Sequence, residues 1–164
     1  MENITIQEIL FQSFPEILLL VVLGTTLVGR KISIKNLLLI VIIMTAISYF
    51  TTKLPGGFRT LGLLLNYIFI LLIFSNLRII EIVLAAILSI VCEGIVEMIY
   101  YPTFLYLTSF TTDDIISNSY LRIIGFIPEA LILLVFILLL KKYKISILYW
   151  NNKLTAQYQI NEDK

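Results

Sequence analysis

Long apolar runs constrain this chain more than any other feature of its sequence. Residues 121–140 read LRIIGFIPEALILLVFILLL, and four comparable runs precede them. A helix needs roughly 20 mostly apolar residues to cross the hydrocarbon core of a bilayer, which is about 30 Å thick. The composition agrees, because 59% of the 164 residues are hydrophobic and only 14% are charged. The sequence therefore predicts an all-α integral membrane protein.

Polar residues, glycines and prolines divide the apolar sequence into a bundle of about five transmembrane helices. We expect these spans at about 6–28, 37–52, 60–74, 79–107 and 121–140, with a tight hairpin at 75–78. Pro15 falls in the first turns of the first span or bends it, and Pro128 holds a matching place in the last; both are expected helix-breaking or structural residues. Pro55, Gly56 and Gly57 are expected to break the helix after the second span, in a turn or a short re-entrant piece.

The positions of Lys and Arg indicate the direction of the spans, because cytoplasmic loops retain positive charge. With the N-terminus outside and the C-terminus in the cytoplasm, nine of the twelve bases and three acids lie inside, against three bases and eight acids outside. Residues 1–144 then form a five-helix transmembrane domain. Residues 145–164 form an interfacial segment and a polar cytoplasmic tail, in which 145–150 either continue the last helix or lie along the membrane surface.

Four glutamates lie well inside the predicted spans, whereas Glu8 and Glu81 lie near span ends. Glu16 and Glu129 each follow a proline, and Glu93 and Glu97 are four residues apart, on one face of a helix. In the predicted topology all four lie in the outer half of the bundle, Glu16 and Glu129 on the order of 10 Å below the interface. A charged side chain at mid-helix costs about 2.5–3.5 kcal/mol and usually faces a cavity or a partner.

Two cations are expected beside these acids. We expect Arg122 to pair with Glu93 or Glu97, and Arg59 with Glu16. Two interpretations stay open. The charges either hold helices together, or they line an outward-facing cavity that binds a cationic or peptide ligand; in the second case the ligand-binding residues are Glu16, Glu93, Glu97, Glu129, Arg59 and Arg122.

The sequence predicts no enzyme. The chain has no histidine, the commonest zinc ligand and general base, and its single cysteine, Cys92, has no histidine to activate it. We expect no metal, no cofactor and no nucleic-acid binding, because the bases lie singly or in short clusters at the membrane edge. Asn66 in the third span predicts an interhelical hydrogen bond.

Three stretches, EILFQSFPEILLLVVLG, ISYFTTKLPGGFRTL and NSYLRIIGFIPEAL, resemble the membrane sensor region of Gram-positive sensor histidine kinases that carry a GHKL-type ATPase domain. The resemblance spans most of residues 7–140. It implies an input module that senses an extracytoplasmic or membrane-borne signal, such as a peptide. This chain departs from the family because it has no histidine to phosphorylate and stops about 24 residues after the fifth span. It is therefore expected to be a stand-alone sensor in a bacterial cell membrane.

Three functions follow from these observations. The first is a non-enzymatic receptor-like module that signals through a membrane or cytoplasmic protein partner. The second is transport, by a small transporter component or by a cation-conducting homo-oligomer. The third is a structural or immunity-type protein whose charges only join helices.

Overall fold

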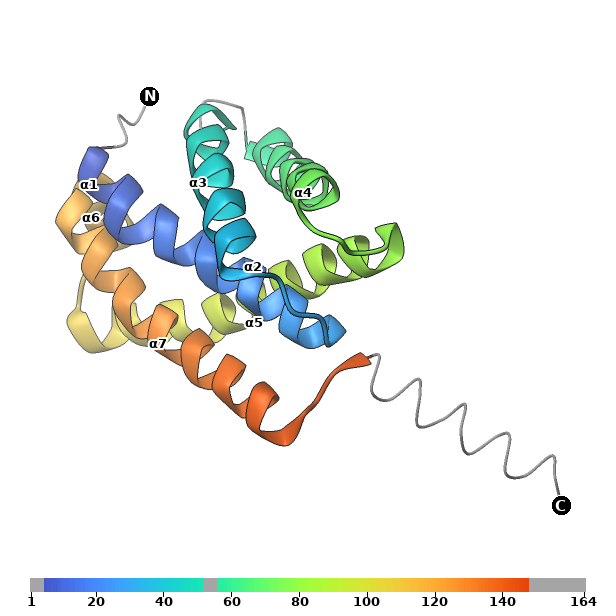
Figure 1. The fold of residues 1–164 in the computed structure, drawn as a ribbon. Helices are drawn as coiled ribbons and strands as arrows, with labels where there is room; N and C mark the ends of the chain where they lie inside the picture. The colour runs from blue at the N-terminus through green and yellow to red at the C-terminus, as the bar shows by residue number, and fades with distance from the viewer. Residues whose placement is uncertain (1–4, 52–55, 148–164) are drawn as a thin grey trace, which may run out of the picture.

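The computed structural model describes residues 5–51 and 56–147, and these residues are almost entirely helical (Figure 1). The elements are α1 (Ile6–Glu8), η1 (Ile9–Ser13), α2 (Phe14–Val28), α3 (Ile34–Thr51), α4 (Gly56–Phe74), α5 (Ile79–Thr108), α6 (Thr112–Ser117) and α7 (Ser119–Tyr143). Within the described ranges the chain has no strand, so the all-α fold class is confirmed. The predicted hairpin at 75–78 is confirmed as the connection between α4 and α5.

Helices α2 and α5 form the centre of the bundle (Figure 1). They pack against each other more extensively than any other described pair. Helix α3 packs on α2 and on α4, and α4 also packs on α5. Helix α7 packs on both central helices, with the short α6 against it. The bundle thus joins α2, α5 and α7 directly, although they are far apart in the sequence.

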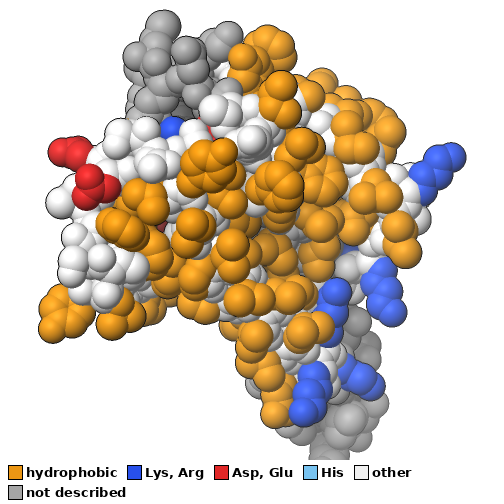
Figure 2. Space-filling view, turned by 90° about the vertical axis from the view of Figure 1, so that its left-hand side faces the viewer, with side chains coloured by type: hydrophobic (Ala, Val, Ile, Leu, Met, Phe, Trp, Pro, Cys, Tyr) orange, Lys and Arg blue, Asp and Glu red, His pale blue; other side chains and the backbone are white. Residues whose placement is uncertain are grey.

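Among the described residues, four helical stretches are long and apolar enough to cross a membrane: Ile6–Val28, Ile34–Thr51, Ile79–Thr108 and Ser119–Tyr143. These stretches fit a membrane protein. In α4 the apolar part, Leu61–Phe74, is shorter than a typical span, so a five-pass count stays a prediction. Figure 2 shows a broad hydrophobic surface, with Lys and Arg mainly at its right and lower right and the visible Asp and Glu at its left.

The core between the helices is made of aliphatic side chains. One cluster joins α2, α3, α4 and α5 through Val21, Ile40, Leu71 and Ile82, all fully buried. A second cluster joins α2 to α7 through Leu23, which packs with residues of α7. Burial of such side chains holds the helices in one arrangement. Many other large apolar residues are exposed on the outer surface, as expected where lipid surrounds a bundle.

Three described helices end at a left-handed residue, and one of these is Ser109 after α5, with φ 56°. Gly29 follows α2 with φ 81°, a conformation that glycine adopts without steric cost, and the N–H of Arg30 then donates to the carbonyl of Thr25. Lys144 follows α7 with φ 53°. The last helix therefore ends at Tyr143 and does not continue unbroken into 145–150, the second half of which lies outside the described residues.

The structure corrects the expected helix breaks. Gly56 and Gly57 lie in the first turn of α4 and not in a break before it, while Pro55 lies outside the described residues. Helix α7 runs through Pro128 without interruption. Helix α5 likewise runs through Pro102 to Thr108, one residue beyond its expected end. Each proline inside a helix removes a backbone donor, but packing on neighbouring helices maintains the helix.

The polar stretch after α5 also contains a helix that sequence reasoning missed. In α6 the Thr111 hydroxyl caps the first turn, because it accepts from the backbone N–H of Asp114 and donates to its carboxylate. This hydrogen bond from Thr111 holds the pKa of Asp114 below its ordinary value. The pattern T-x-x-D is a capping box, a signal that could have predicted the helix start.

Candidate functional site

Glu16 enters the bundle just after a widened turn. The segment η1 is a π-helix, in which the backbone N–H of Phe14 donates to the carbonyl of Ile9, five residues back. Pro15 follows directly and begins α2 in place of breaking the helix. We attribute the π-turn to this proline, because its ring would clash with a carbonyl of the preceding α-helical turn. Glu16 is half-buried on the first turn of α2.

The second source of carboxylates is α5. Glu93 is half-buried, and Glu97 is exposed one turn further along the same face. A row with the same spacing continues through Ser89 and Ala85, both fully buried, to Glu81 near the start of the helix. The row winds around α5 by about 40° at each four-residue step and has acids at both ends. We call it the α5 stripe: Glu81, Ala85, Ser89, Glu93 and Glu97.

The third source is α7, where Glu129 is half-buried next to Pro128. Helix α7 packs on both α2 and α5. The hydroxyl of Tyr100 on α5 donates to the carbonyl of Gly125 on α7 at 2.7 Å. This contact between the two helices holds Glu129 near the acidic end of the α5 stripe.

Glu93 lies within electrostatic range of the other three carboxylates. Glu93 interacts with Glu16, Glu97 and Glu129, and Glu129 interacts with Glu97. The sequence predicts that these side chains converge, and the tertiary structure places them on three helices around Glu93. We call Glu16, Glu93, Glu97 and Glu129 the carboxylate cluster.

Arg122 has a partner that the sequence analysis did not consider. Its Nε lies 2.9 Å from Oε1 of Glu8, because α1 packs on α7 and brings Glu8 to the guanidinium. Among the described residues, Arg122 therefore forms its ion pair with Glu8 and not the expected pair with Glu93 or Glu97. The side chains are 4% exposed for Glu8 and 19% for Arg122. The ion pair is therefore largely buried.

Glu8 is a residue whose role sequence reasoning missed. Its Oε2 also accepts from the backbone N–H and the hydroxyl of Thr5, which completes a capping box at the first helix. The spacing T-x-x-E at the head of an apolar run is the signal that could have drawn attention to Glu8. Arg59 lies in α4, but its side chain is outside the described residues, so the expected pair with Glu16 stays a prediction.

A buried hydroxyl links three helices beside the carboxylate cluster. Tyr67 of α4 is 1% exposed, and its hydroxyl donates to the carbonyl of Leu20 at 3.0 Å. Ser89 neighbours this hydroxyl, and Glu93 lies within its electrostatic range. Tyr67 therefore touches α2 and the α5 stripe one turn from Glu93. The sequence carries no signal for this contact, since it depends on how α4 packs.

Helices α2 and α5 approach closely at Gly24. A Cβ atom at this position would lie 2.5 Å from the carbonyl oxygen of Ala85 and 2.8 Å from the hydroxyl of Tyr67. Only the absence of a side chain permits this approach. Along α2 and α5, this contact lies between the carboxylate cluster and the ends of the two helices that are opposite to the cluster.

An ion pair joins α2 and α5 at that other end. Arg30 Nη2 lies 2.7 Å from Glu81 Oε1, and Oε2 of Glu81 accepts from the backbone N–H of Arg78. Glu81 thus caps α5 and holds the end of α2 at the same time. Further bases lie near this pair in the sequence, so we call the region formed by 29–36, 74–82 and 140–147 the basic end.

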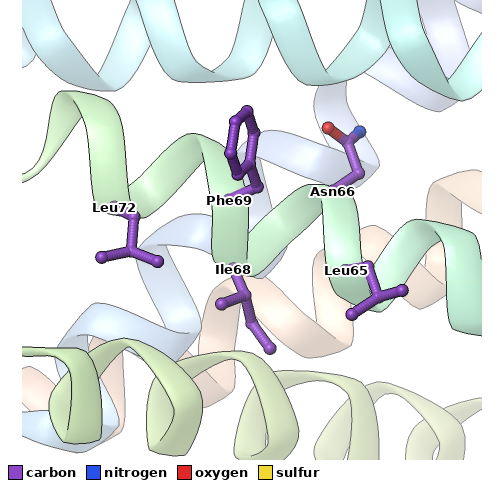
Figure 3. A pocket seen from close by; sticks show the side chains of 5 residues that line it. All are labelled: Leu65, Asn66, Ile68, Phe69 and Leu72. Atoms are coloured by element: carbon purple, nitrogen blue, oxygen red, sulfur yellow. The ribbon is translucent and has the colours of Figure 1, made fainter.

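A shallow groove of about 420 Å³ lies on α4 (Figure 3). Its lining residues are Leu65, Asn66, Ile68, Phe69 and Leu72. The Nδ2 atom of Asn66 is buried and has no hydrogen-bond partner among the described residues, so its donor does not form the interhelical hydrogen bond predicted for this amide. The lining is mainly apolar and contains no acid, so the groove offers no charge to recognise a cation.

In the described part of the chain, no group of three or more His, Cys, Asp and Glu is arranged to hold a metal ion. Comparison with protein-family models, with curated proteins and with solved structures returns no match. The site is therefore interpreted from its own geometry.

Proposed function

We propose that this chain is a non-enzymatic, receptor-like membrane protein whose carboxylate cluster binds a cationic ligand, either a small molecule or a basic peptide. The observation that supports this proposal is that acids from α2 and α7, Glu16 and Glu129, lie within electrostatic range of Glu93 on α5. Burial and neighbouring acids both disfavour the ionised form of these carboxyl groups in the empty site. A bound cation stabilises the ionised form, and this attraction contributes to its affinity.

The acids on α5 and α7, which are Glu93, Glu97 and Glu129, favour a ligand of positive charge. The guanidinium of Arg122 is engaged by Glu8, and that pair is largely shielded from solvent. The exposed Glu97 is the member of the cluster that a cation in solvent meets first.

Binding is transmitted along the pair of helices α2 and α5. A ligand that draws Glu16 and Glu93 together changes how these two helices cross, and Gly24 is a point at which they touch. Tyr67 ties this point to α4, and the ion pair of Arg30 with Glu81 ties the far ends. In the predicted orientation the far end faces the cytoplasm, where a partner protein receives the change. This role agrees with the resemblance to a sensor region, in which a membrane module supplies the input.

The proposal is tested with the full chain in nanodiscs, using a Lys-rich peptide and tetraethylammonium as cationic probes. Replacing the four glutamates of the cluster with glutamine removes the charges at nearly constant volume. We expect it to weaken probe binding at least about tenfold, with helix content unchanged by circular dichroism. The matched control is Asp113→Asn with Asp114→Asn, two exposed acids on α6. A quadruple variant that folds and binds both probes like the parent refutes the ligand site.

Transport is the second candidate, and the α5 stripe favours it. The polar residues of this stripe run from the exposed Glu97 through Glu93 to the buried Ser89, the kind of residues that a path for a cation requires. The close contact of Gly24 with Ala85 follows further along the same two helices. Cation flux in liposomes that is lost in Glu93→Gln and Glu97→Gln variants supports transport. Ligand binding without flux supports the receptor.

A further inference from the structure

The basic end carries lysines that nothing in the described protein neutralises. Arg30 is engaged by Glu81, which is the one acid in the described sequence at this end. The exposed lysines that have no acidic partner among the described residues are Lys31, Lys35, Lys141, Lys142 and Lys144. Their positive charge is therefore available to a partner of opposite charge.

Packing brings four of these bases to neighbouring helix ends. One core cluster joins α2 to α7, and its buried members are Leu23, Leu133, Ile137 and Leu140. Lys31 follows the end of α2, while the other three bases, Lys141, Lys142 and Lys144, lie in and after the last turn of α7. The shared core therefore places these lysines at neighbouring ends of α2 and α7.

The lysines of α7 lie at the boundary of its apolar surface. Leu138 and Leu139 are exposed just before them, where lipid is expected to surround the helix, and Tyr143 is exposed among them. The Nζ atom of Lys142 lies 5.8 Å from the centre of the Tyr143 ring. Tyrosine is enriched at membrane interfaces, and lysine extends its ammonium group toward the headgroups. We therefore expect these ammonium groups at the level of the lipid headgroups.

We propose that Lys31, Lys141, Lys142 and Lys144 form a binding surface for the headgroups of anionic phospholipids. Charge complementarity supports this partner, because the surface is basic, uncompensated among the described residues and directly beside the exposed apolar residues of α7. A juxtamembrane Lys or Arg contributes about 1 kcal/mol of attraction to an anionic membrane surface, which is a factor of about five in affinity. This surface is independent of the carboxylate cluster and of its proposed ligand.

The test measures phospholipid binding to the full chain by native mass spectrometry in detergent. Phosphatidylglycerol and phosphatidylcholine with the same acyl chains are compared, and inorganic phosphate is the free-anion control. We expect the parent to bind phosphatidylglycerol in preference to phosphatidylcholine, and excess phosphate not to displace it. The variant with Lys141, Lys142 and Lys144 changed to Gln is expected to lose about 100-fold in affinity for phosphatidylglycerol. The matched variant with three Arg is expected to retain it.

The proposal is overturned if the Gln variant binds phosphatidylglycerol as tightly as the parent does. It is also overturned if the parent binds the two lipids equally. Displacement of phosphatidylglycerol by inorganic phosphate overturns it as well. If the Gln variant does not fold, a salt titration of the parent decides instead, because a lysine surface loses affinity as salt rises; affinity that does not change with salt refutes the surface. The quadruple glutamine variant of the carboxylate cluster is expected to bind phosphatidylglycerol like the parent. A failure of the proposed ligand site can therefore be distinguished from a failure of the lipid-binding surface.

Discussion

Substitution of Gly24 by alanine tests the packing on which the proposed signal path depends. The added Cβ would lie 2.5 Å from the carbonyl oxygen of Ala85 and 2.8 Å from the hydroxyl of Tyr67. The carbonyl belongs to a helix backbone and cannot rotate away, so α2 and α5 have to separate. Overpacking of this kind costs about 1–3 kcal/mol. The higher helix propensity of alanine returns up to about 1 kcal/mol.

Two other glycines provide matched controls. A Cβ at Gly94 would meet nothing within 4 Å, and one at Gly125 would lie 3.5 Å from Phe104, an ordinary contact. We expect Gly94→Ala to be neutral or to stabilise the protein by up to about 1 kcal/mol, because only helix propensity changes. Gly125→Ala is expected to behave in the same way. The gain in propensity is common to all three variants, so the free energy of unfolding should differ by about 1–3 kcal/mol between the Gly24 and Gly94 variants.

The assay is reversible unfolding of the three variants in mixed micelles, followed by helix content in far-ultraviolet circular dichroism. A Gly24→Ala variant as stable as the Gly94→Ala variant refutes the close approach of α2 and α5. Binding of a cationic probe is measured on the same samples. If Gly24 is the point through which the two helices act, its variant also changes probe affinity, whereas the Gly94 variant does not.

Three further contacts give predictions measured by the same unfolding assay. Arg30→Gln is expected to lower the free energy of unfolding by about 1 kcal/mol, a modest amount because the Arg30 side chain is 45% exposed. A double-mutant cycle with Glu81→Gln should show coupling between the two residues. Additive effects of the two substitutions contradict the ion pair. Arg122→Gln is expected to lower the free energy of unfolding by more, about 3 kcal/mol, because it leaves the buried carboxylate of Glu8 without its cation. Adding Glu8→Gln should recover part of this loss. A double variant no more stable than Arg122→Gln contradicts that reason. Tyr67→Phe is expected to cost about 1 kcal/mol through its lost hydrogen bond, and unchanged stability contradicts that bond.

Local sequence predicted the positions of the helices well where composition alone decides them. The hairpin at 75–78 follows from polar residues between two apolar runs, and the first long helical stretch begins at Ile6 as expected. Predictions failed where neighbouring helices support the backbone. Pro128 does not break α7, and Gly56 begins α4, because a glycine or proline in a bundle is tolerated when packing supplies the stability that local propensity lacks.

The candidate site divides in the same way. The spacing of Glu93 and Glu97 puts them on one face of a helix whatever the fold, and the proline before Glu16 and Glu129 marks matching places in two spans. The ion-pair partner of Arg122 could not be predicted from the sequence. Arg122 reaches Glu8 only because α1 packs on α7.

The sequence by itself determined that the chain is helical, that its helices are apolar enough for a membrane, and that four acids fall well inside them. These properties depend on the length, periodicity and composition of single segments. Only the tertiary structure decided that Tyr67 reaches Leu20, that Gly24 touches Ala85 and that Glu93 has acids from two other helices around it. Such contacts join residues far apart in the chain, so they depend on which faces pack together and on the volume of every side chain between them.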